Sequence, residues 1–521
     1  MSWSHTIGLI LFLSTNLQAQ SLQSFLIPLA SGHPLPPSNT FNKIVPHGDT
    51  VWVGTGKGLS LTTDKGSSWV QLTTAETFDE KGVSAIAILG DRIWVATAFS
   101  TKLDNETIAT GHGLHVSNDR GKTWKFIQQP VDTGKVDTLT YGRNKIPALA
   151  ITVPQQNITY DIALSNSSAW IASWGGMLRK TTDDGKTWQR IILPPDNLDR
   201  ISPSDTLKFA LSNVTKFFAS DPLYNKDTLR ASLNHVMFSL CISRDSTIWV
   251  GTANGINKST DGGVSWEKFN HQNQVQSISG NFVVAIAEHT WKSKRIIWAA
   301  TNNAVDPGEK RGVSFTQDGG RSWTRALLGE FTHDIATRDS IVYVAADGGL
   351  FRSADFGVSW IRSGTIFDRT SLQRFASSVI YGVGVKGDTV WVGGPEGLAY
   401  TIDSPSQPFG TTWKVFRTYE QVASTGKTYS FPLPFSPASE VVRIHYAIGS
   451  SPSTVTIRIF DFAMQPVKTL LRDASRQGAT EVDEIWNGRD DNNRRVANGV
   501  YFYRVEVGDS EPQWGKILVL Q

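Results

Sequence analysis

The sequence predicts an all-β protein with two domains, a seven-bladed β-propeller followed by an immunoglobulin-like β-sandwich. Three observations lead to this prediction. A motif of the form S/T-x-D-x-G-x-x-W recurs seven times between residues 62 and 413. A short β-branched and aromatic run precedes each copy, which is typical of strands in repeated antiparallel sheets. After residue 417 the motif stops, and segments of alternating apolar and polar residues follow.

The motif, which we call the box, is clearest in residues 259–266, which read Ser-Thr-Asp-Gly-Gly-Val-Ser-Trp. Close or degenerate copies occupy 62–69, 117–124, 181–188, 316–323 and 353–360, and a stretched copy extends from Thr401 through Gly410 to Trp413. The box aspartates are Asp64, Asp119, Asp183, Asp261, Asp318, Asp355 and Asp403, and the box tryptophans are Trp69, Trp124, Trp188, Trp266, Trp323, Trp360 and Trp413.

The residue types of the box indicate a structural role. An Asp carboxylate two residues before a Gly can accept hydrogen bonds from N–H groups of its own turn, and the Gly supplies the positive φ that a tight turn needs. The Trp is expected to lie between neighbouring sheets, where it buries roughly 150–250 Å². At about 25 cal/mol per Å² this burial is worth on the order of 4–6 kcal/mol before entropy is subtracted. We therefore expect the box aspartates to be neither catalytic residues nor metal ligands.

The run before each box completes the repeat. Residues 247–255 show it as a β-branched and aromatic segment that ends in small residues and Gly, and matching runs begin near residues 51, 93, 169, 296, 341 and 390. With the strand before it, such as 236–242 or 282–288, each unit predicts one four-stranded antiparallel sheet. The repeats span residues 41–417.

These boxes resemble the Asp-box, or BNR, repeats of sialidases, sortilin-type receptors, xyloglucanases and photosystem II assembly factors. The resemblance implies a β-propeller for residues 41–417. It does not select an activity, because the box occurs in proteins of many functions.

Long insertions indicate which face of the propeller is functional. Segments 129–157 and 194–233 follow the fourth strand of a unit, and segments 98–112 and 302–311 join its second and third strands, so strand order places all four on the face opposite the boxes. Insertions on a repeated scaffold commonly carry function. The candidate contact residues there are His112, Tyr141, Arg143, Trp174, Tyr224, Asn254, Asn302, Asn303, Asp347 and Glu396.

Two alternatives remain open for this face. Trp174 directly follows a predicted strand and could stack on a sugar or peptide, although it could instead pack against the 129–157 insertion. Asp347 and Glu396 follow second strands of successive units and could approach each other across the pore. Such a pair would suit glycoside hydrolysis, which needs two carboxyl groups about 5–9.5 Å apart, or the two could be solvated turn residues.

Departures from the enzyme families favour a binding protein. A sialidase-like site would need an arginine trio whose first member lies in an early Arg-Ile-Pro motif, and the sequence has only the interrupted string 143–147. A xyloglucanase-like cleft lies between two propellers, and one is predicted here. We expect a non-catalytic binding or scaffolding module for a surface glycan or protein. The alternatives are a glycan-cleaving hydrolase and a periplasmic assembly factor.

The N-terminal segment and the composition suggest export. Residues 1–19 resemble a signal peptide, with an apolar run at 7–13 and a cleavage site near Ala19; residues 20–40 form a polar lead-in. The apolar run at 7–13 is too short to span a bilayer, and the sequence contains no longer apolar segment that could do so. The net charge of +3 gives no support for nucleic-acid binding. Cys241 is the one cysteine and is expected to be a buried thiol. We expect a secreted or surface-located bacterial monomer, with the periplasm as the alternative, that needs no cofactor.

After a polar linker at 418–429, residues 430–521 predict the second domain. Alternating strands are expected at 441–447, 454–460, 467–471, 480–486, 499–507 and 516–520. The segments 432–437 (Pro-Leu-Pro-Phe-Ser-Pro), 486–490 (Trp-Asn-Gly-Arg-Asp) and 499–504 (Gly-Val-Tyr-Phe-Tyr-Arg) resemble the FlgD-like Ig domain and the sorting domains of type IX secretion cargo. The resemblance implies contact with export machinery, although Leu433 and Met464 depart from the family pattern.

Residues 490–493 (Asp-Asp-Asn-Asn) offer oxygen atoms of the kind that bind calcium. A tight turn between two strands is the favoured explanation of these residues, so no metal site is predicted.

Overall fold

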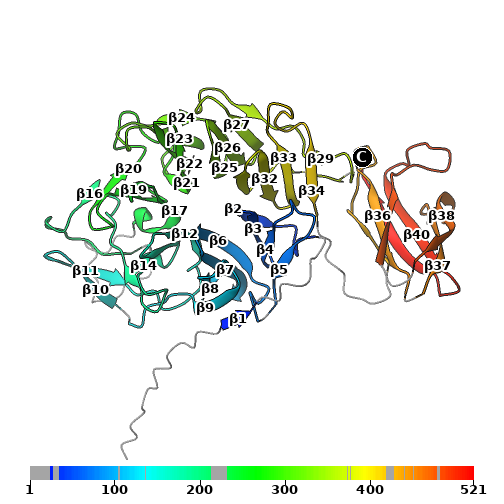
Figure 1. Cartoon of the computed structure of the whole chain (residues 1–521), viewed down its shortest axis with the longest axis horizontal. Coiled ribbons are helices and arrows are strands. Elements are labelled where there is room, and N and C mark those ends of the chain that lie inside the picture. The colour runs from blue at the N-terminus through cyan, green and yellow to red at the C-terminus, as the bar shows by residue number, and fades with distance from the viewer. Residues whose placement is uncertain are drawn as a thin grey trace, which may run out of the picture.

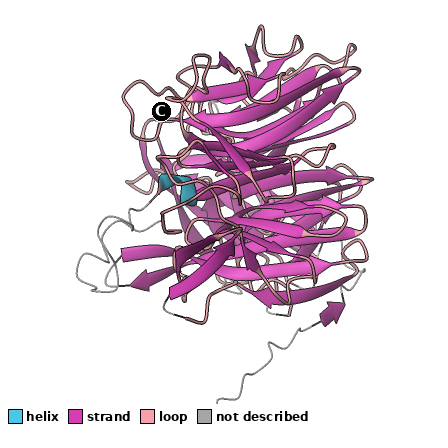
Figure 2. Ribbon diagram, turned by 90° about the vertical axis from the view of Figure 1, so that its left-hand side faces the viewer, coloured by secondary structure: helices cyan, strands magenta, loops and turns pink. Residues whose placement is uncertain are grey.

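A computed structural model shows an all-β chain (Figures 1 and 2). The only helical element in the part described is the 3-10 turn η1 (Leu233–His235). Across the same residues, no helix is both long and apolar enough to cross a membrane. The structure describes residues 24–26, 35–74, 76–103, 106–134, 136–212, 232–371, 373–375, 377–417, 428–438, 440–449, 451–477 and 481–520.

Between residues 41 and 416, the described residues form seven sheets that each contain four consecutive antiparallel strands. The first sheet contains β2 (Phe41–His47), β3 (Thr50–Thr55), β4 (Gly58–Thr62) and β5 (Val70–Leu72); the second, β6 (Gly82–Leu89), β7 (Arg92–Leu103), β8 (Glu106–Ser117) and β9 (Thr123–Gln128); and the third, β12 (Thr159–Leu164), β13 (Ala169–Ser173), β14 (Met177–Thr181) and β15 (Gln189–Arg190). The fourth contains β17 (Met237–Ile242), β18 (Ile248–Thr252), β19 (Gly255–Ser259) and β20 (Trp266–Phe269), and the fifth contains β21 (Phe282–Trp291), β22 (Lys294–Asn302), β23 (Gly312–Thr316) and β24 (Thr324–Ala326). The sixth contains β25 (Thr332–Arg338), β26 (Ile341–Ala346), β27 (Gly349–Ser353) and β28 (Ile361–Arg362), and the seventh contains β31 (Gly382–Lys386), β32 (Thr389–Gly394), β33 (Gly397–Ile402) and β34 (Trp413–Phe416).

Short additional strands join this pattern. β1 (Ser24–Leu26) pairs with β9, and β16 (Arg200–Ile201) pairs with β20, so both extend a sheet at its outer edge. β10 (Val136–Tyr141) with β11 (Asn144–Leu149), and β29 (Phe367–Asp368) with β30 (Gln373–Arg374), form separate hairpins. The segment 98–112, expected as a loop, is instead the extended part of the β7–β8 hairpin, whose pairing continues to Leu103 and Glu106.

The seven sheets form a ring around their first strands. β2 lies beside β6, and the contacts continue in order through β12, β17, β21, β25 and β31, which lies beside β2 again (Figure 1). The four strands of each sheet are consecutive, so within the described part of the chain no strand is exchanged between the first and seventh sheets. The ring therefore closes through side-chain packing.

Polar side chains connect neighbouring sheets near the ring centre. In the part described, six of the seven first strands contain a β-bulge after their first or second residue. A bulge turns a side chain out of the regular alternation. Side chains at or next to these bulges bond to the backbone of the next sheet: Asn42 to Val83 O, Ser84 to Thr159 O, Asp161 to Leu240 N, Ser239 to Val283 O, and Asp334 to Val383 N.

Six boxes share one hydrogen-bond pattern. The first Ser or Thr hydroxyl donates to the Asp Oδ1 at 2.7–2.8 Å and accepts the Gly N–H at 2.8–2.9 Å. Oδ1 also accepts the N–H of the residue four positions after the Asp, at 2.9–3.0 Å, and Oδ2 accepts that residue's hydroxyl. The Gly φ lies between +81° and +98°. The Thr187 hydroxyl is the main cause that lowers the pKa of Asp183 to about 2.

The seventh box differs from the others. Thr401 Oγ1 donates to Thr412 O at 2.7 Å rather than to Asp403. The buried Asp403 carboxylate instead accepts hydrogen bonds from the Tyr343 hydroxyl and from Arg352 Nε in the preceding sheet. Two changes explain this: the turn after Asp403 is longer, and Tyr343 stands where the other sheets have Trp, so a hydroxyl reaches Asp403. Asp403 of the stretched copy therefore bonds to the preceding sheet rather than within its own turn.

Tryptophan pairs fill the space between sheets. The box Trp of one sheet packs edge-on against a Trp from the second strand of the preceding sheet, at interplanar angles of 68–89°. The pairs and their centroid distances are Trp52–Trp124, 6.3 Å; Trp94–Trp188, 6.1 Å; Trp249–Trp323, 6.4 Å; Trp298–Trp360, 6.2 Å; and Trp391–Trp69, 6.2 Å. The last pair lies across the closure between the seventh and first sheets.

The C-terminal residues form a separate two-sheet unit. β35 (Tyr429–Phe431), β36 (Val442–Ala447) and β39 (Glu481–Trp486) make one sheet, and β38 (Pro466–Arg476), β37 (Ser453–Phe460), β40 (Gly499–Val507) and β41 (Gln513–Val519) make the other. Six of these strands overlap the six segments expected from the alternation. Trp486, Tyr446 and Tyr503 are fully buried in a core of their own. Arg443 donates to Ser371 O at 2.8 Å and thereby contacts the ring.

Candidate functional site

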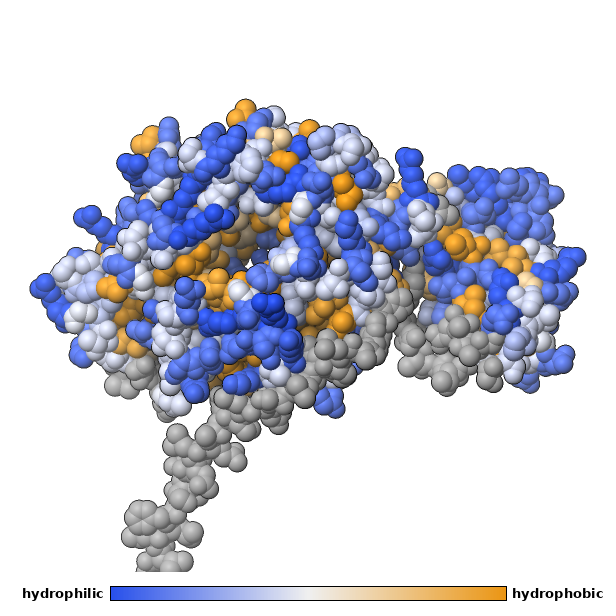
Figure 3. All heavy atoms as spheres, in the orientation of Figure 1, coloured by the Kyte–Doolittle hydropathy of each residue, from blue (hydrophilic) through white to orange (hydrophobic). Residues whose placement is uncertain are grey.

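The bulges bring aromatic side chains to one opening of the ring. Tyr160, Phe238 and His333 occupy the bulged position of β12, β17 and β25. The register of the strands places these residues at the same height in their sheets, where the chain enters the first strand. The segments that join second and third strands, which include Trp174 and Asp347, lie at this end, opposite the boxes. In Figure 3, apolar atoms border part of the hollow at the ring centre, and more hydrophilic atoms border the rest.

One cluster, which we call the aromatic opening, contains Tyr160, Trp174 and Phe238 together with Phe282, the first residue of β21. Phe238 lies at its centre, with ring centroids 5.6 Å from Tyr160, 5.5 Å from Trp174 and 4.2 Å from Phe282. Phe238 is 7% exposed, whereas Tyr160 and Trp174 are each 38% exposed. The buried Phe238 ring thus supports the cluster, while Tyr160 and Trp174 are partly open to solvent. Trp174 packs on Phe238 and is not part of the protein interior.

A polar group lies farther round the same opening. His333 Nε2 is 2.7 Å from Asp347 Oδ1, and the His333 ring contacts Tyr381 and Phe331 at 5.3 and 5.1 Å. Ser378 Oγ donates to Asp347 O at 2.6 Å. About half of the Asp347 side chain is exposed. This group can offer a carboxylate and hydroxyl donors beside aromatic surface.

Charged side chains line the ring next to these bulges. Lys43 Nζ is 3.3 Å from Asp334 Oδ1, and Asp334 is 10% exposed. Burial raises the pKa of Asp161, and the nearby charge of Lys43 opposes that rise. Although burial by itself lowers the pKa of Lys43, the charges of Asp334 and Asp161 raise it above its ordinary value. One cation therefore offsets two carboxylates near the ring centre.

The two carboxylates considered for hydrolysis have different partners. Asp347 pairs with His333, whereas Glu396 accepts hydrogen bonds from Ser377 N at 2.8 Å and Arg417 at 3.0 Å. The segment containing Ser377 and Ser378 bonds to both residues, because Ser378 donates to the Asp347 carbonyl. Both carboxylates lie in the turn between the second and third strands of their sheets, but Asp347 is held by His333 and Glu396 by Arg417.

Several other predicted contact residues serve the fold. Asn302 is buried and donates to Thr332 O at 3.1 Å. Asn254 donates to Asp196 Oδ1 at 2.8 Å, which fixes the insertion before β17. His112 bonds to Thr97 Oγ1 and packs 4.8 Å from Phe126, and burial lowers its pKa. Asn303 is exposed and accepts from Arg311 Nε at 3.0 Å.

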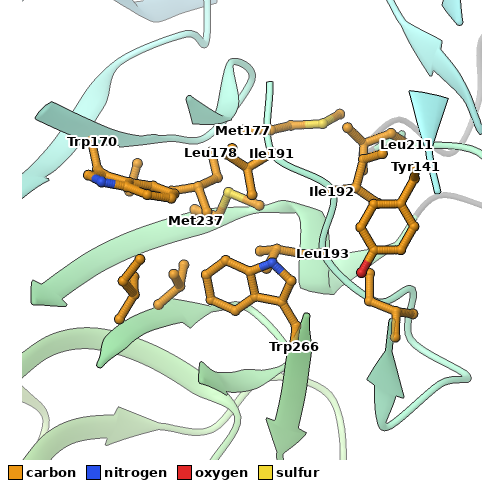
Figure 4. Close-up of a cluster of buried hydrophobic side chains, with 14 of the residues drawn as sticks. Tyr141, Trp170, Met177, Leu178, Ile191, Ile192, Leu193, Leu211, Met237 and Trp266 are labelled. Carbon is orange, nitrogen blue, oxygen red and sulfur yellow. The ribbon is translucent and has the colours of Figure 1, made fainter. Parts of the chain in front are cut away.

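Tyr141 lies at the end of the ring that carries the boxes rather than on the predicted face. The hairpin β10–β11 of the 129–157 insertion packs on a core that contains Trp170, Met237 and Trp266 (Figure 4). The end of the insertion stays beside the aromatic opening, because Gln156 O accepts the N–H of Gly175, next to Trp174, at 2.9 Å. Tyr141 is 8% exposed and donates its hydroxyl to Val264 O, inside the box of the fourth sheet. The reason is that β15 has only two residues, so apolar surface beside it needs another cover. Arg143 is exposed at the tip of this hairpin. Tyr224 lies outside the described residues.

Sequence reasoning missed Tyr160, Phe238, Phe282 and His333. It aligned the repeats on the box and so ignored the start of each first strand. Tyr160 and Asp161, Phe238 and Ser239, and His333 and Asp334 stand in the same register, so aligning the first strands would have placed the aromatic residues at equivalent positions.

The described residues contain no group of three or more His, Cys, Asp or Glu side chains arranged to hold a metal ion. Asp490 Oδ1 instead accepts the Arg494 N–H at 2.8 Å in a turn, and Asp491 pairs with Lys468 at 3.3 Å. Burial raises the pKa of the Cys241 thiol to about 12, which disfavours the reactive thiolate.

Comparisons with known proteins give one match in sequence and several in fold. No protein-family model matches the chain. A sialidase of Bacteroides fragilis is 33% identical over 95 residues, which represent 15% of this chain and only 18% of the sialidase. A GH74 enzyme of Niastella koreensis is similar in fold, with a TM-score of 0.46 at 14% identity. The match covers 94% of this chain and 74% of the enzyme chain. YCF48 bound to a D1 peptide has a TM-score of 0.40 at 16% identity, and the match covers 78% of this chain and 99% of the YCF48 chain. The ring of sheets and the sialidase match support a β-propeller.

Proposed function

We propose that this protein is a non-catalytic binding module, exported or located at the cell surface, that holds a glycan or protein at the aromatic opening. In this proposal the seven sheets are the blades of a seven-bladed propeller, and residues 430–521 are an immunoglobulin-like sandwich that serves export or anchoring. The chain acts as a monomer and needs no cofactor.

The observation that carries the binding role is the cluster of Tyr160 and Trp174 around Phe238. Two large aromatic faces remain 38% exposed although a rigid ring supports them. Aromatic rings held in this way stack on sugar rings or on apolar peptide side chains at little entropic cost. The neighbouring Asp347 and His333 add polar groups that can orient such a ligand.

A second function, glycan hydrolysis, is favoured by the short sialidase match. Against it, Asp347 and Glu396 are paired with different basic residues, His333 and Arg417. Hydrolysis by two carboxyl groups needs both to face one glycosidic bond. The paired arrangement supports the binding role over the enzymatic one.

The test begins with the full chain on a panel of polysaccharides, sialylated glycans and peptides. We expect binding without product release, and at least about tenfold weaker binding by Trp174→Ala, because truncating a central aromatic contact commonly costs more than about 1.4 kcal/mol. Val358→Ala is the matched control, since Val358 is 84% exposed in a box turn at the other end of the ring.

Product release that is lost in Asp347→Asn or Glu396→Gln would make the protein a hydrolase. Unchanged binding by Trp174→Ala would remove the aromatic opening as the site. Binding of peptides alone would favour an assembly-factor role within the same proposal.

The export role of residues 430–521 rests on their independent core, which is separate from the ring. We expect deletion of residues 430–521 to leave the ring folded but retained inside the cell, while the full chain reaches the cell surface or the medium. Cell fractionation followed by circular dichroism of the purified protein measures both. Equal export of the truncated and full chains would contradict this role.

A further inference from the structure

A groove lies between the ring and the C-terminal domain. The hairpin β29–β30 of the ring forms one side, and β36 with the segment before it forms the other. In Figure 1, β29 lies at the side of the ring that faces β36. The groove consists of two hollows, of about 150 Å³ and about 490 Å³, which share Arg374, Glu440 and Val441. We call the two hollows together the interdomain groove.

Apolar side chains line much of the interdomain groove. They are Phe431, Pro432 and Val441 in the smaller hollow and Phe367, Pro437 and Ala438 in the larger one. Concave apolar surface with a few polar groups beside it is typical of binding sites in proteins. The groove can therefore take up apolar side chains of a partner.

Arginines stand beside this apolar surface. Arg374, Arg417 and Arg443 line the smaller hollow. Arg489 lines the larger hollow, to which Arg374 also belongs. Among the described residues that line the two hollows, Glu440 carries the only carboxylate.

The carboxylates next to the groove already have cationic partners. The pairs are Glu396 with Arg417 at 3.0 Å, Asp368 with Lys414 at 3.4 Å, and Asp490 with Arg494 at 3.0 Å. Once these pairs are set aside, Arg374, Arg443 and Arg489 remain against Glu440, which accepts the Ser436 N–H at 3.2 Å. Three cations against one carboxylate favour an anionic partner.

Arg374 is the residue most in need of a partner. Within the described part of the chain its guanidinium forms no ion pair, and its Nε is buried without a hydrogen-bond partner. Leaving a buried donor unsatisfied costs about 1–3 kcal/mol. A guanidinium offers N–H groups in one plane, which match the two oxygens of a carboxylate. A carboxylate in the groove would therefore bind Arg374 well.

The other two arginines also have donors to offer. Arg443 donates to Ser371 O at 2.8 Å, and Arg489 donates to Asn493 O at 2.8 Å. Each of these bonds goes to a neutral carbonyl and uses one of the five N–H groups of a guanidinium. Both side chains are thus held in position while their charge is not neutralised.

We propose that the interdomain groove binds an acidic peptide segment of a protein partner. An extended segment in which acidic and apolar residues alternate presents its carboxylates to one side and its apolar side chains to the other. The carboxylates pair with Arg374, Arg443 and Arg489, and the apolar side chains fill the two hollows. A sugar chain would instead bring hydroxyl groups against apolar surface, where they lose hydrogen bonds to water. This site is separate from the aromatic opening, and the inference goes beyond the proposed function.

The experiment is fluorescence anisotropy of labelled short peptides titrated with the full chain. The probe is Glu-Leu-Glu-Leu-Glu. Two control peptides each lack one feature: Gln-Leu-Gln-Leu-Gln has no side-chain charge, and Glu-Ser-Glu-Ser-Glu has no apolar side chain. We expect the probe to bind and both control peptides to bind at least about tenfold more weakly.

The variants test the arginines. Arg374→Gln should weaken binding of the probe at least about tenfold, because it removes charge-assisted hydrogen bonds. Arg489→Gln is a second variant with the same expected effect. Arg472→Gln is the matched control, since Arg472 is exposed on β38 in the other sheet of the domain. Thermal unfolding followed by circular dichroism checks that each variant is folded.

The outcomes separate this groove from the aromatic opening. Binding that is lost in Arg374→Gln but kept in Arg472→Gln and Trp174→Ala supports the proposal. Equal losses in Arg374→Gln and Arg472→Gln would show attraction by net charge alone and overturn it, as would a wild-type chain that does not bind the probe. Displacement of the probe by alginate, a polymer of uronate sugars, at a lower concentration of acidic groups would assign the groove to a polysaccharide and also overturn it.

Discussion

We expect Trp391→Ala to lower the free energy of unfolding of the ring by about 3–5 kcal/mol, the usual cost of removing a large aromatic side chain from a core. Trp391 is 1% exposed and contacts three aromatic residues. Tyr400 at 4.9 Å and Phe416 at 5.9 Å belong to its own sheet, and Trp69 at 6.2 Å belongs to the first sheet. Among the residues that the structure describes, no strand crosses this closure, so its stability depends on these side chains. Denaturant unfolding followed by circular dichroism measures the change.

The matched control is Trp249→Ala. Trp249 pairs with Trp323 at 6.4 Å between two sheets that also follow each other in the chain. A closed ring predicts similar losses for the two variants. A loss at Trp391 of less than about 1 kcal/mol, with a full loss at Trp249, would contradict closure between the first and seventh sheets.

The second large effect is expected from Lys43→Met, which keeps the length of the side chain but removes its charge. Breaking a fully buried ion pair commonly costs about 3–5 kcal/mol because the remaining charge is left without a partner. Lys43 is 27% exposed, so we expect a smaller loss, about 2 kcal/mol near neutral pH. Denaturant unfolding at several pH values measures it.

The pH dependence has a definite sign. Burial raises the pKa of Asp161 above its unfolded value, so the folded state binds the additional proton and stability falls as pH rises from about 4 through the folded pKa. The raised pKa of Lys43 keeps its contribution throughout this range. Without Lys43 the pKa of Asp161 rises further, and the difference in the free energy of unfolding between variant and wild type should grow as pH increases from roughly 4 to 8.

Adding Asp334→Asn to Lys43→Met should restore part of the lost stability. A loss that is independent of pH and not restored would mean that Lys43 acts through packing alone.

The box was the most informative feature of the sequence because its hydrogen bonds are local. Thr181, Asp183, Gly185 and Thr187 lie within seven residues, and each supplies one partner of the same turn. Local spacing therefore fixes the turn, and the turn fixes the pairing of the strands on either side. Asp403 shows the limit: its partners Tyr343 and Arg352 are 60 and 51 residues away in the chain.

The candidate site could be predicted only in part for the same reason. Trp174 was found because it directly follows a strand and precedes a glycine pair in the sequence. Phe238, its support, was not found, since the contact depends on a bulge that turns one side chain of β17 toward the neighbouring sheet. Tyr141 was misplaced because the two-residue β15 leaves apolar surface that a distant hairpin covers.

The order of the strands, the turns between them and the change of pattern after residue 417 could be predicted, because each depends on residues a few positions apart. The structure was needed to find which side chains meet at the opening, where the insertions lie and how the ring closes. Those contacts join residues far apart in the chain, and they depend on the packing of whole sheets against one another, which no local spacing records.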